Sequence, residues 1–308
     1  MVGPIVVVGS INMDLVFRVP RFPRAGETLP GTDFRRFPGG KGANQAVGLA
    51  RLGGDVRLIG ALGRDPYGKE LKASLQEEGV DVSRIIETGE TTGLAAITLS
   101  EDGENSIITI AGANHQVTPE AVLEARELFR EAWGVLLQLE IPLKTVQTAA
   151  RLGKENGCKV FLDPAPVTEL PDSIYKNIDY LLPNSGELEA LLPAEKDNKA
   201  RAEKLLGWGV KNLILKKGEE GSSIFSGEGR VDYPAFAVKV VDTTAAGDAF
   251  AAALCYSLQT GYPIEKAIVF ANAAGGVAAT RLGARSSLPF REDILKLQKE
   301  AKVDEVDY

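Results

Sequence analysis

The sequence predicts an α/β fold, a three-layer sandwich whose mostly parallel central sheet is flanked by helices, with a small β-sheet lid added to it. Three observations lead to this prediction. Apolar, β-branched runs alternate with amphipathic stretches along most of the chain. These runs are continuously apolar, which is typical of strands buried on both faces of a parallel sheet. Two segments, one rich in Pro and Gly and one typical of a hairpin, interrupt the alternation and indicate antiparallel β structure.

The elements of the main sheet follow in chain order. Strands are predicted at 5–10, 56–63, 135–140, 160–166 and 212–218. Helices are predicted at 43–52, 67–78, 118–133, 144–156, 186–192 and 199–207, and the part of the chain after 240 is expected to be mainly helical. In the helix at 118–133, Thr118 suits the N-cap and Pro119 suits the first turn. This alternation predicts parallel strands with helices on both sides.

The interrupting segments lie at 15–37 and 91–112, and the second indicates a hairpin that turns at Asp102-Gly103. Two or three strands rarely bury a face alone, so we expect one small sheet built from both segments, closing over a ligand or pairing with a second subunit. The expected division is a main domain of 1–14, 38–89 and 113–308, and a lid and homodimer contact of 15–37 and 90–112. The tail at 302–308 is expected to fray.

Composition narrows the class of partner and the location. The chain has 308 residues and a net charge of −7, which argues against nucleic acid as a partner but leaves small anions bound by backbone N–H groups. Cys158 and Cys255 have neither metal-site spacing nor disulfide density, so they are expected to be buried thiols in a reducing compartment. The first apolar run is too short for a signal peptide or a membrane span. We therefore expect a cytoplasmic protein.

The stretch VVDTTAAGDAF at 240–250 places an acid among small residues, between a strand-like and a helical segment. Ala245, Ala246 and Gly247 leave little side-chain volume, so a ligand can approach the unsatisfied N–H groups of the first helical turn. Asp248 faces that anion site and is expected to be kept ionised by the helix dipole. Such a carboxylate can accept the proton of a hydroxyl that attacks a phosphoryl group. Asp248 is therefore the candidate general base.

A purely structural interpretation of this stretch stays open. Asp248 is also an ordinary acid for the first turn of a helix. Asp242 and the Thr243-Thr244 pair are either caps or oxygen ligands for a cation.

Two further motifs suit a ligand with several hydroxyl groups. Asn12 and Asp14 follow the first strand, where open parallel sheets bind ligands, and an amide with a carboxylate can grip vicinal hydroxyls; an Asx-type turn is the alternative. In PGGKGAN at 38–44, the glycines let the backbone approach a ligand closely, and Lys41 and Asn44 supply hydrogen-bond donors. This turn lacks the Ser or Thr that follows Gly-Lys in a Walker A motif, so it is not one. It also follows no predicted strand, so it is not a dinucleotide-binding fingerprint.

Several motifs together resemble the PfkB-type carbohydrate kinases. DTTAAGDAF is similar to the C-terminal signature of that family, and its Ala-Ala-Gly-Asp form resembles the members that phosphorylate ribose. FPGGKGANQAVGLARLG at 37–53 is similar to the N-terminal signature. Further agreement comes from GSINMD, AGAN, QLE, DPAP, PNSGE and TRLGA, so the resemblance spans nearly the whole chain.

The resemblance implies an ATP-dependent enzyme that phosphorylates D-ribose at O5, with Mg²⁺ and a monovalent cation, K⁺, as cofactors. It implies that sugar is bound by Asn12, Met13, Asp14, Gly40, Lys41, Gly42, Ala43, Asn44, Glu140 and Asp248. It implies that nucleotide and Mg²⁺ are bound by Asn184, Glu187, Lys216, Lys217, Gly218, Glu219, Glu220, Gly221, Gly247 and Asn272. It implies that the cation lies at Asp242, Thr244, Ala278, Arg281, Gly283 and Ser287.

Some alternatives remain at this point. PNSGE at 183–187 also suits a helix start with Asn184 as cap, and the glycines at 218 and 221 suit a plain β-turn. Lys216 stands where some relatives have Thr, and Asn272 where a His can pack on adenine. Another sugar or a nucleoside is the nearest alternative substrate, and a sugar-sensing protein without catalysis is the alternative class. His115, the single histidine, is expected to be exposed and uninvolved.

Overall fold

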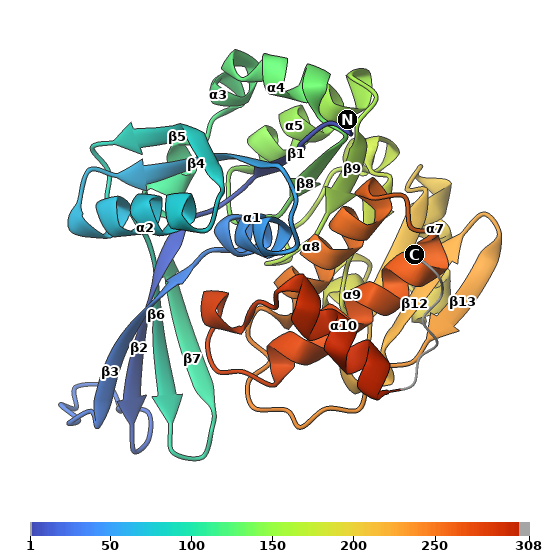
Figure 1. Cartoon of the computed structure of the whole chain (residues 1–308). Helices are drawn as coiled ribbons and strands as arrows, with labels where there is room; N and C mark the ends of the chain where they lie inside the picture. Colours follow the sequence, from blue (N-terminus) through green and yellow to red (C-terminus); the bar gives the residue numbers. More distant parts are fainter. Residues whose placement is uncertain (1, 302–308) are drawn as a thin grey trace.

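A computed structural model describes residues 2–301 of the chain; the tail at 302–308 lies outside the described residues. Figure 1 shows a large α/β body from which a small sheet projects. The large sheet has nine strands in the order β13-β12-β11-β10-β9-β8-β1-β4-β5, and all of its pairs are parallel except those that involve β12 and β13. The predicted fold class is confirmed.

The strands of the large sheet are short and buried toward its centre. Their bounds are Ile5–Val8 (β1), Val56–Gly63 (β4), Asp81–Thr88 (β5), Gly134–Leu137 (β8), Lys159–Leu162 (β9), Tyr180–Leu181 (β10), Asn212–Lys216 (β11), Ser222–Ser226 (β12) and Gly229–Tyr233 (β13). Ile5 and Val7 of β1 face one apolar cluster while Val6 and Val8 face the other. The continuous apolar run therefore serves two cores, one on each face of the sheet.

Helices cover both faces. One face carries Lys41–Arg51 (α1), Pro66–Glu77 (α2), Ala246–Gln259 (α8), Ile264–Ala279 (α9) and Arg291–Glu300 (α10). The other carries Pro119–Glu124 (α3), Arg126–Glu131 (α4), Leu143–Glu155 (α5), Ser185–Leu191 (α6) and Asn198–Gly207 (α7). Short 3₁₀ turns lie at Gly112–Gln116 (η1), Asp172–Asn177 (η2), Gly218–Glu220 (η3) and Arg285–Ser287 (η4). No helix among residues 2–301 is long and apolar enough to cross a membrane.

The structure differs from the sequence prediction in a few elements. The helix predicted at 118–133 is broken at Ala125 into α3 and α4, although Thr118 does cap it by accepting from the Ala121 N–H at 3.3 Å. The strands β5 and β13 escaped prediction because their exposed polar residues interrupt the apolar pattern, and the buried β12 escaped it because serines interrupt its apolar run. The strands predicted at 135–140 and 160–166 end early, at Leu137 and Leu162, so the polar residues that follow lie in loops at the carboxyl edge of the sheet.

The small sheet contains β2 (Asn12–Val19), β3 (Asp33–Gly39), β6 (Gly93–Ser100) and β7 (Asn105–Ile110), in the order β3-β2-β6-β7. β6 and β7 form the predicted hairpin. The predicted borders at 14/15 and 37/38 fall inside β2 and β3. The register places Asn12 and Asp14 on one face of this sheet and Phe17 on the opposite face, where Phe34, Ile108 and Ile110 join it.

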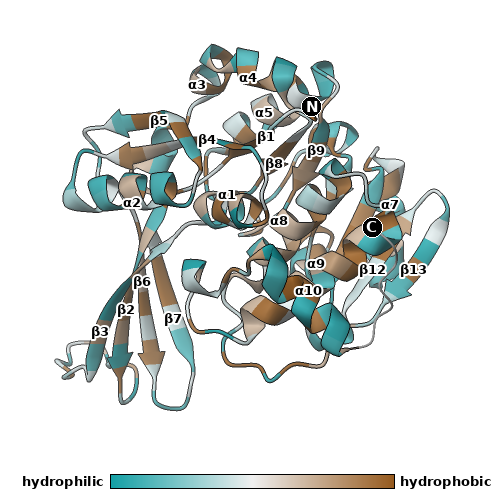
Figure 2. Ribbon diagram, in the orientation of Figure 1, coloured by the Kyte–Doolittle hydropathy of each residue, from teal (hydrophilic) through white to brown (hydrophobic). Residues whose placement is uncertain are grey.

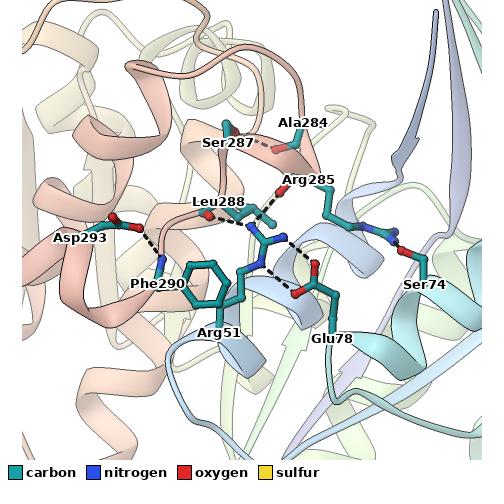
Figure 3. Close-up of polar contacts among 9 residues, drawn as sticks. All are labelled: Arg51, Ser74, Glu78, Ala284, Arg285, Ser287, Leu288, Phe290 and Asp293. Carbon is teal, nitrogen blue, oxygen red and sulfur yellow. Dashed lines mark hydrogen bonds and ion pairs between the residues drawn. The ribbon is translucent and has the colours of Figure 1, made fainter.

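Two contacts hold α1 in place. At its N-terminus, a Cβ on Gly42 would lie 2.5 Å from the carbonyl carbon of Gly9, so only glycine lets α1 cross the end of β1 this closely. At its C-terminus, Arg51 pairs with Glu78 and donates to the carbonyl oxygens of Arg285 and Leu288, at 3.1 and 2.7 Å (Figure 3). The η4 loop, which carries part of the predicted cation site, is therefore tied to α1.

Candidate active site

A cavity of about 660 Å³ opens at the carboxyl edge of the large sheet. Its polar lining consists of Lys41, Asp163, Asn184, Glu187, Lys216, Glu219, Thr243, Asp248 and Asn272. Its apolar lining includes Phe236, Val238, Val240, Phe250 and Ala279, with glycines at 218, 221, 247, 275 and 276. One end is thus charged and the other apolar, as a nucleotide with phosphates and a base requires. Figure 2 shows apolar colouring along the loop that precedes α8.

The N-terminus of α8 forms the floor of the charged end. Ala245, the N-cap, adopts the left-handed conformation with φ 60°, which an alanine rarely takes and which often marks a functional site. The N–H of Ala246 donates to Thr243 O at 3.2 Å, whereas those of Gly247 and Asp248 have no acceptor among the described residues. Among the amides predicted to be free, at 245–248, Ala246 thus already has a partner, whereas the N–H of Ala245 also has no acceptor among the described residues. Gly247 and Asp248 keep their N–H groups available for an anion.

Asp248 is 4% exposed, and its carboxylate lies at the cavity wall. Its Oδ2 accepts from Asn44 Nδ2 at 3.1 Å and its Oδ1 from Gln45 Nε2 at 3.0 Å. Burial raises the pKa of Asp248 above its ordinary value, and the nearby Lys41 opposes that rise. The expectation that the helix dipole alone keeps this acid ionised is thus incomplete. Burial makes it a stronger proton acceptor, which suits a general base.

Two ammonium groups line the charged end of the cavity. Lys41 begins α1; burial lowers its pKa, but the carboxylates of Asp248, Asp163 and others outweigh burial and hold the pKa above its ordinary value. Lys216 ends β11 and forms an ion pair with the buried Asp163 at 2.8 Å. A Cβ on Gly247 would lie 3.4 Å from Lys216 Nζ, so this ammonium is next to the free amides. The charged end can therefore hold a phosphate group.

Three of the predicted sugar positions, Asn12, Asp14 and Glu140, form a cluster of polar side chains near Lys41 and Asp248. Asn12 Oδ1 accepts from Asn114 Nδ2 at 2.7 Å, and Asp14 lies within electrostatic range of Glu140 and Asp248. Glu140 Oε2 accepts from the N–H of Lys41 at 3.0 Å, at the start of α1. This cluster lies outside the cavity lining, which it meets at Lys41 and Asp248.

The remaining sugar positions differ in what they offer. Asn44 Oδ1 is buried without a hydrogen-bond partner among the described residues, so it is available to a hydroxyl group. The side chains of Met13 and Ala43 are fully buried in the apolar core, which leaves only their backbone for a ligand. Gly40, with φ 86°, and Gly42 shape the turn into α1.

Asn184 and Glu187 form the capping box that was the structural alternative. Asn184 Oδ1 accepts from the N–H of Glu187 at 2.8 Å, and Glu187 Oε2 accepts from the N–H of Asn184 at 2.7 Å. Both residues also line the cavity, and Glu187 Oε1 accepts no hydrogen bond within the part of the chain that the structure describes. The helix cap and the predicted Mg²⁺ and nucleotide contact are compatible, since Glu187 has a second carboxylate oxygen besides the one used in the cap.

The predicted nucleotide loop is only partly at the cavity. Gly218, Glu219 and Gly221 line it, as does Lys216. Lys217 instead pairs with Asp232 on β13 at 3.0 Å, and neither it nor Glu220 belongs to the lining. Asn272 lies in the lining and donates to Pro234 O at 3.2 Å, which ties α9 to the apolar loop.

Three of the predicted cation positions, Thr244, Gly283 and Ser287, come together around Asp242. Its Oδ1 accepts from Thr244 N and Oγ1, and its Oδ2 accepts from Gly283 N at 2.9 Å. Ser287 Oγ lies 3.4 Å from Thr244 O. The side chain of Arg281 pairs with Asp293 at 2.9 Å, so only its carbonyl could meet a cation. Ala278, buried on α9, likewise offers only its carbonyl.

Sequence reasoning missed three buried polar residues at the site, Gln45, Asp163 and Asn114. Asp163 follows directly on β9, so the rule that ligands bind beyond the carboxyl ends of parallel strands would have found it. Gln45 and Asn114 carried no such signal, because buried amides inside a helix or a 3₁₀ turn look like ordinary packing. The single histidine, His115, is exposed in η1, as expected.

Comparison with known proteins gives consistent matches. A family profile described as pfkB family carbohydrate kinase matches residues 4–291. The ribokinase of Haemophilus influenzae is 37% identical over 301 residues, covering 96% of this chain and 98% of that protein. The solved ribokinase of Thermotoga maritima has a TM-score of 0.91 at 39% identity, covering 96% and 99% of the two chains. Arabidopsis thaliana ribokinase, solved with ribose and ATP, has a TM-score of 0.91 at 36% identity, covering 97% and 99%.

Proposed function

Because this chain belongs to the pfkB family of carbohydrate kinases, we propose that it transfers the terminal phosphoryl group of ATP to O5 of D-ribose, giving D-ribose 5-phosphate. One observation carries the proposal. The carboxylate of Asp248 lies between the sugar cluster and the charged end of the cavity, beside two free amides and two ammonium groups. The acceptor hydroxyl and the phosphate would therefore meet at this carboxylate.

The residues divide the work of transfer between them. Asn12, Asp14, Asn44 and Glu140 orient the sugar through its hydroxyls. Asp248 accepts the proton of the attacking hydroxyl. The N–H groups of Gly247 and Asp248, with Lys41 and Lys216, stabilise the negative charge on the phosphoryl oxygens as it moves. The apolar end, with Asn272, receives the adenine.

The two proposed cations suit the oxygens that the chain presents. Glu187 and Asn184 would hold Mg²⁺, which binds few protein ligands and keeps waters, and which neutralises charge on the nucleotide phosphates when bound. K⁺ would lie among the Asp242 carboxylate, the Thr244 carbonyl and the carbonyls of 278, 281 and 283, an all-oxygen set. A cation held there would lie at the loop that leads into α8 and would help to orient the amides of its first turn.

The test is a panel of pentoses, hexoses, nucleosides and aldonic acids with ATP, each assayed with and without Mg²⁺ and K⁺. Ribose should give the highest kcat/KM, the product should carry phosphate on O5, and omission of either cation should lower the rate. A different best acceptor would retain the family and change the sugar. If the protein phosphorylated none of these acceptors, the result would contradict the proposal and favour a sugar-sensing protein.

Ribose affinity should depend on pH through Asp14. Burial, Glu140 and Asp248 raise the pKa of Asp14 to about 7, against the lowering effect of Arg285. The ionised carboxylate accepts hydrogen bonds from two hydroxyl groups of the sugar, whereas the protonated form has less capacity to accept them. Binding should thus weaken as pH falls, by about tenfold between pH 8 and pH 6. Calorimetric titration with ribose measures this, and Asp14→Asn should bind weakly with no such dependence; a flat wild-type profile would contradict the assignment.

We also propose a homodimer through the small sheet, in a cytoplasmic enzyme. The sheet face opposite Asp14 exposes Phe34 (51%), Ile108 (66%) and Ile110 (50%), an apolar group of the kind that partner surfaces cover. Figure 2 shows the apolar bands on these projecting strands. Sedimentation at micromolar protein should give the dimer mass, and a monomer would count against this assignment. Cys158 and Cys255 are free and buried, in keeping with a reducing location.

A further inference from the structure

We propose that Gln45 is a positioning residue of the transfer reaction, whose one side-chain amide holds the carboxylates of Asp248 and Asp163 at a set distance from each other. Gln45 lies on α1 and is fully buried. Its Nε2 donates to Asp248 Oδ1 at 3.0 Å and to Asp163 Oδ2 at 3.0 Å. The inference rests on the proposed function, because it takes Asp248 as the base.

The orientation of this amide is determined by a second buried glutamine. Gln138 follows β8 and donates through Nε2 to Gln45 Oε1 at 2.6 Å. Both protons of Gln45 Nε2 are thereby left for the two carboxylates. The reverse orientation would turn Gln45 Oε1 toward two anions. Gln138 itself packs on backbone, since a Cβ on Gly9 would lie 2.0 Å from its Oε1.

Each carboxylate has a different partner on its other oxygen. Asp248 Oδ2 accepts from Asn44, on the sugar side, and Asp163 Oδ1 accepts from Lys216, on the phosphate side. Gln45 therefore connects the proton acceptor to the ammonium that stands beside the free amides. The distance between acceptor hydroxyl and phosphate is set in part through this one side chain.

A neutral donor suits this position better than a charged one. Two neighbouring carboxylates repel each other, and a shared amide offsets the repulsion through hydrogen bonds without adding charge. A Lys or Arg at this position would hold Asp248 ionised so firmly that it would be a weak base. The groups facing Asp248 are Lys41 and Asn44 on α1, Asp163 after β9 and Asp14 on β2. Burial and Asp163 raise the pKa of Asp248, and Gln45 lowers it, so loss of Gln45 should raise that pKa further.

The test is Gln45→Met, which keeps the length of the side chain and removes its donors. With ribose and ATP, kcat at neutral pH should fall about tenfold, and the acid limb of the kcat profile should move up by about one pH unit. The KM for ribose should change less than threefold, because the sugar contacts remain. A slower enzyme with an unmoved acid limb would overturn the inference, since a merely structural role predicts that result.

Carboxyl ¹³C NMR on Asp-labelled protein measures the protonation of Asp248 directly, without turnover. The Asp248 signal is identified by its loss in Asp248→Asn, and its midpoint should rise in Gln45→Met and, by less, in Gln138→Leu, which removes only the orienting bond. Thr145→Val, which deletes a buried hydroxyl bonded to Val117 O at 2.6 Å, should leave it unmoved. An unchanged midpoint in both glutamine variants overturns the inference, whereas a wild-type chain that fails to phosphorylate ribose overturns the proposed function instead.

Discussion

Asp248→Asn should lower kcat by about three orders of magnitude, within the range that a lost general base produces. Asparagine has the same shape, its oxygen can still accept from Gln45, and its NH2 group can donate to the Asn44 oxygen once the Asn44 amide turns over, so the fold around it should hold. It cannot take a proton from the acceptor hydroxyl. The KM for ribose should stay within about threefold, because a group that acts only in the transition state contributes little to ground-state binding. Steady-state kinetics with saturating ATP measure both.

Asp197→Asn is the matched control for that substitution. Asp197 caps α7 by accepting from Ala200 N at 2.8 Å and does not line the cavity, and asparagine caps a helix equally well. Its kcat should equal that of the wild-type chain. If Asp248→Asn kept more than a tenth of the wild-type kcat, another group would have to be the base.

Gly42→Ala should destabilise the protein by about 3 kcal/mol, the upper part of the range for overpacking. The added Cβ would lie 2.5 Å from Gly9 C and 2.6 Å from Ser10 N, and both are backbone atoms that cannot rotate away. The N-terminus of α1 would have to move off β1, which takes Asn44 and Gln45 away from Asp248. We expect kcat to fall as well, by about tenfold or more. Denaturant unfolding and kinetics on the same preparation measure the two effects.

Gly207→Ala provides the comparison for the loss of a helical glycine. Gly207 ends α7, and a Cβ there would meet nothing within 4 Å, so alanine should leave stability unchanged or raise it by up to about 1 kcal/mol. Equal stability of Gly42→Ala and the wild-type chain would show that α1 does not approach β1 as closely as described.

The sequence pattern predicted the main sheet because its central strands are buried on both faces. β4 was predicted at its observed bounds, whereas the half-exposed β5 and the exposed β13 lack an apolar run and were missed. Asp248 stood out because small residues surround it in the sequence. Gln45 did not, because its importance depends on Asp163 and Asp248, which are 118 and 203 residues away along the chain. Contacts of that separation leave no trace in local composition, so the supporting shell of the site required the structure.

Ala246 illustrates the same limit on a smaller scale. Its N–H was predicted to be free because the first turn of any helix has unsatisfied donors. The left-handed conformation of Ala245 folds the chain back so that Thr243 O reaches that N–H. Which amides remain free therefore depends on a single φ angle, which no motif specifies.

The strand β3 ends at Gly39 and the helix α1 starts at Lys41, so only Gly40 separates them. The strand β2, which presents Asn12 and Asp14, pairs with β3 along its length, so the small sheet is joined to the helix that carries Lys41 through a one-residue connection. A tilt of the projecting sheet would therefore move the N-terminus of that helix directly through the main chain. Such a movement would link recognition of the sugar to alignment of the phosphate without an intervening layer of side chains.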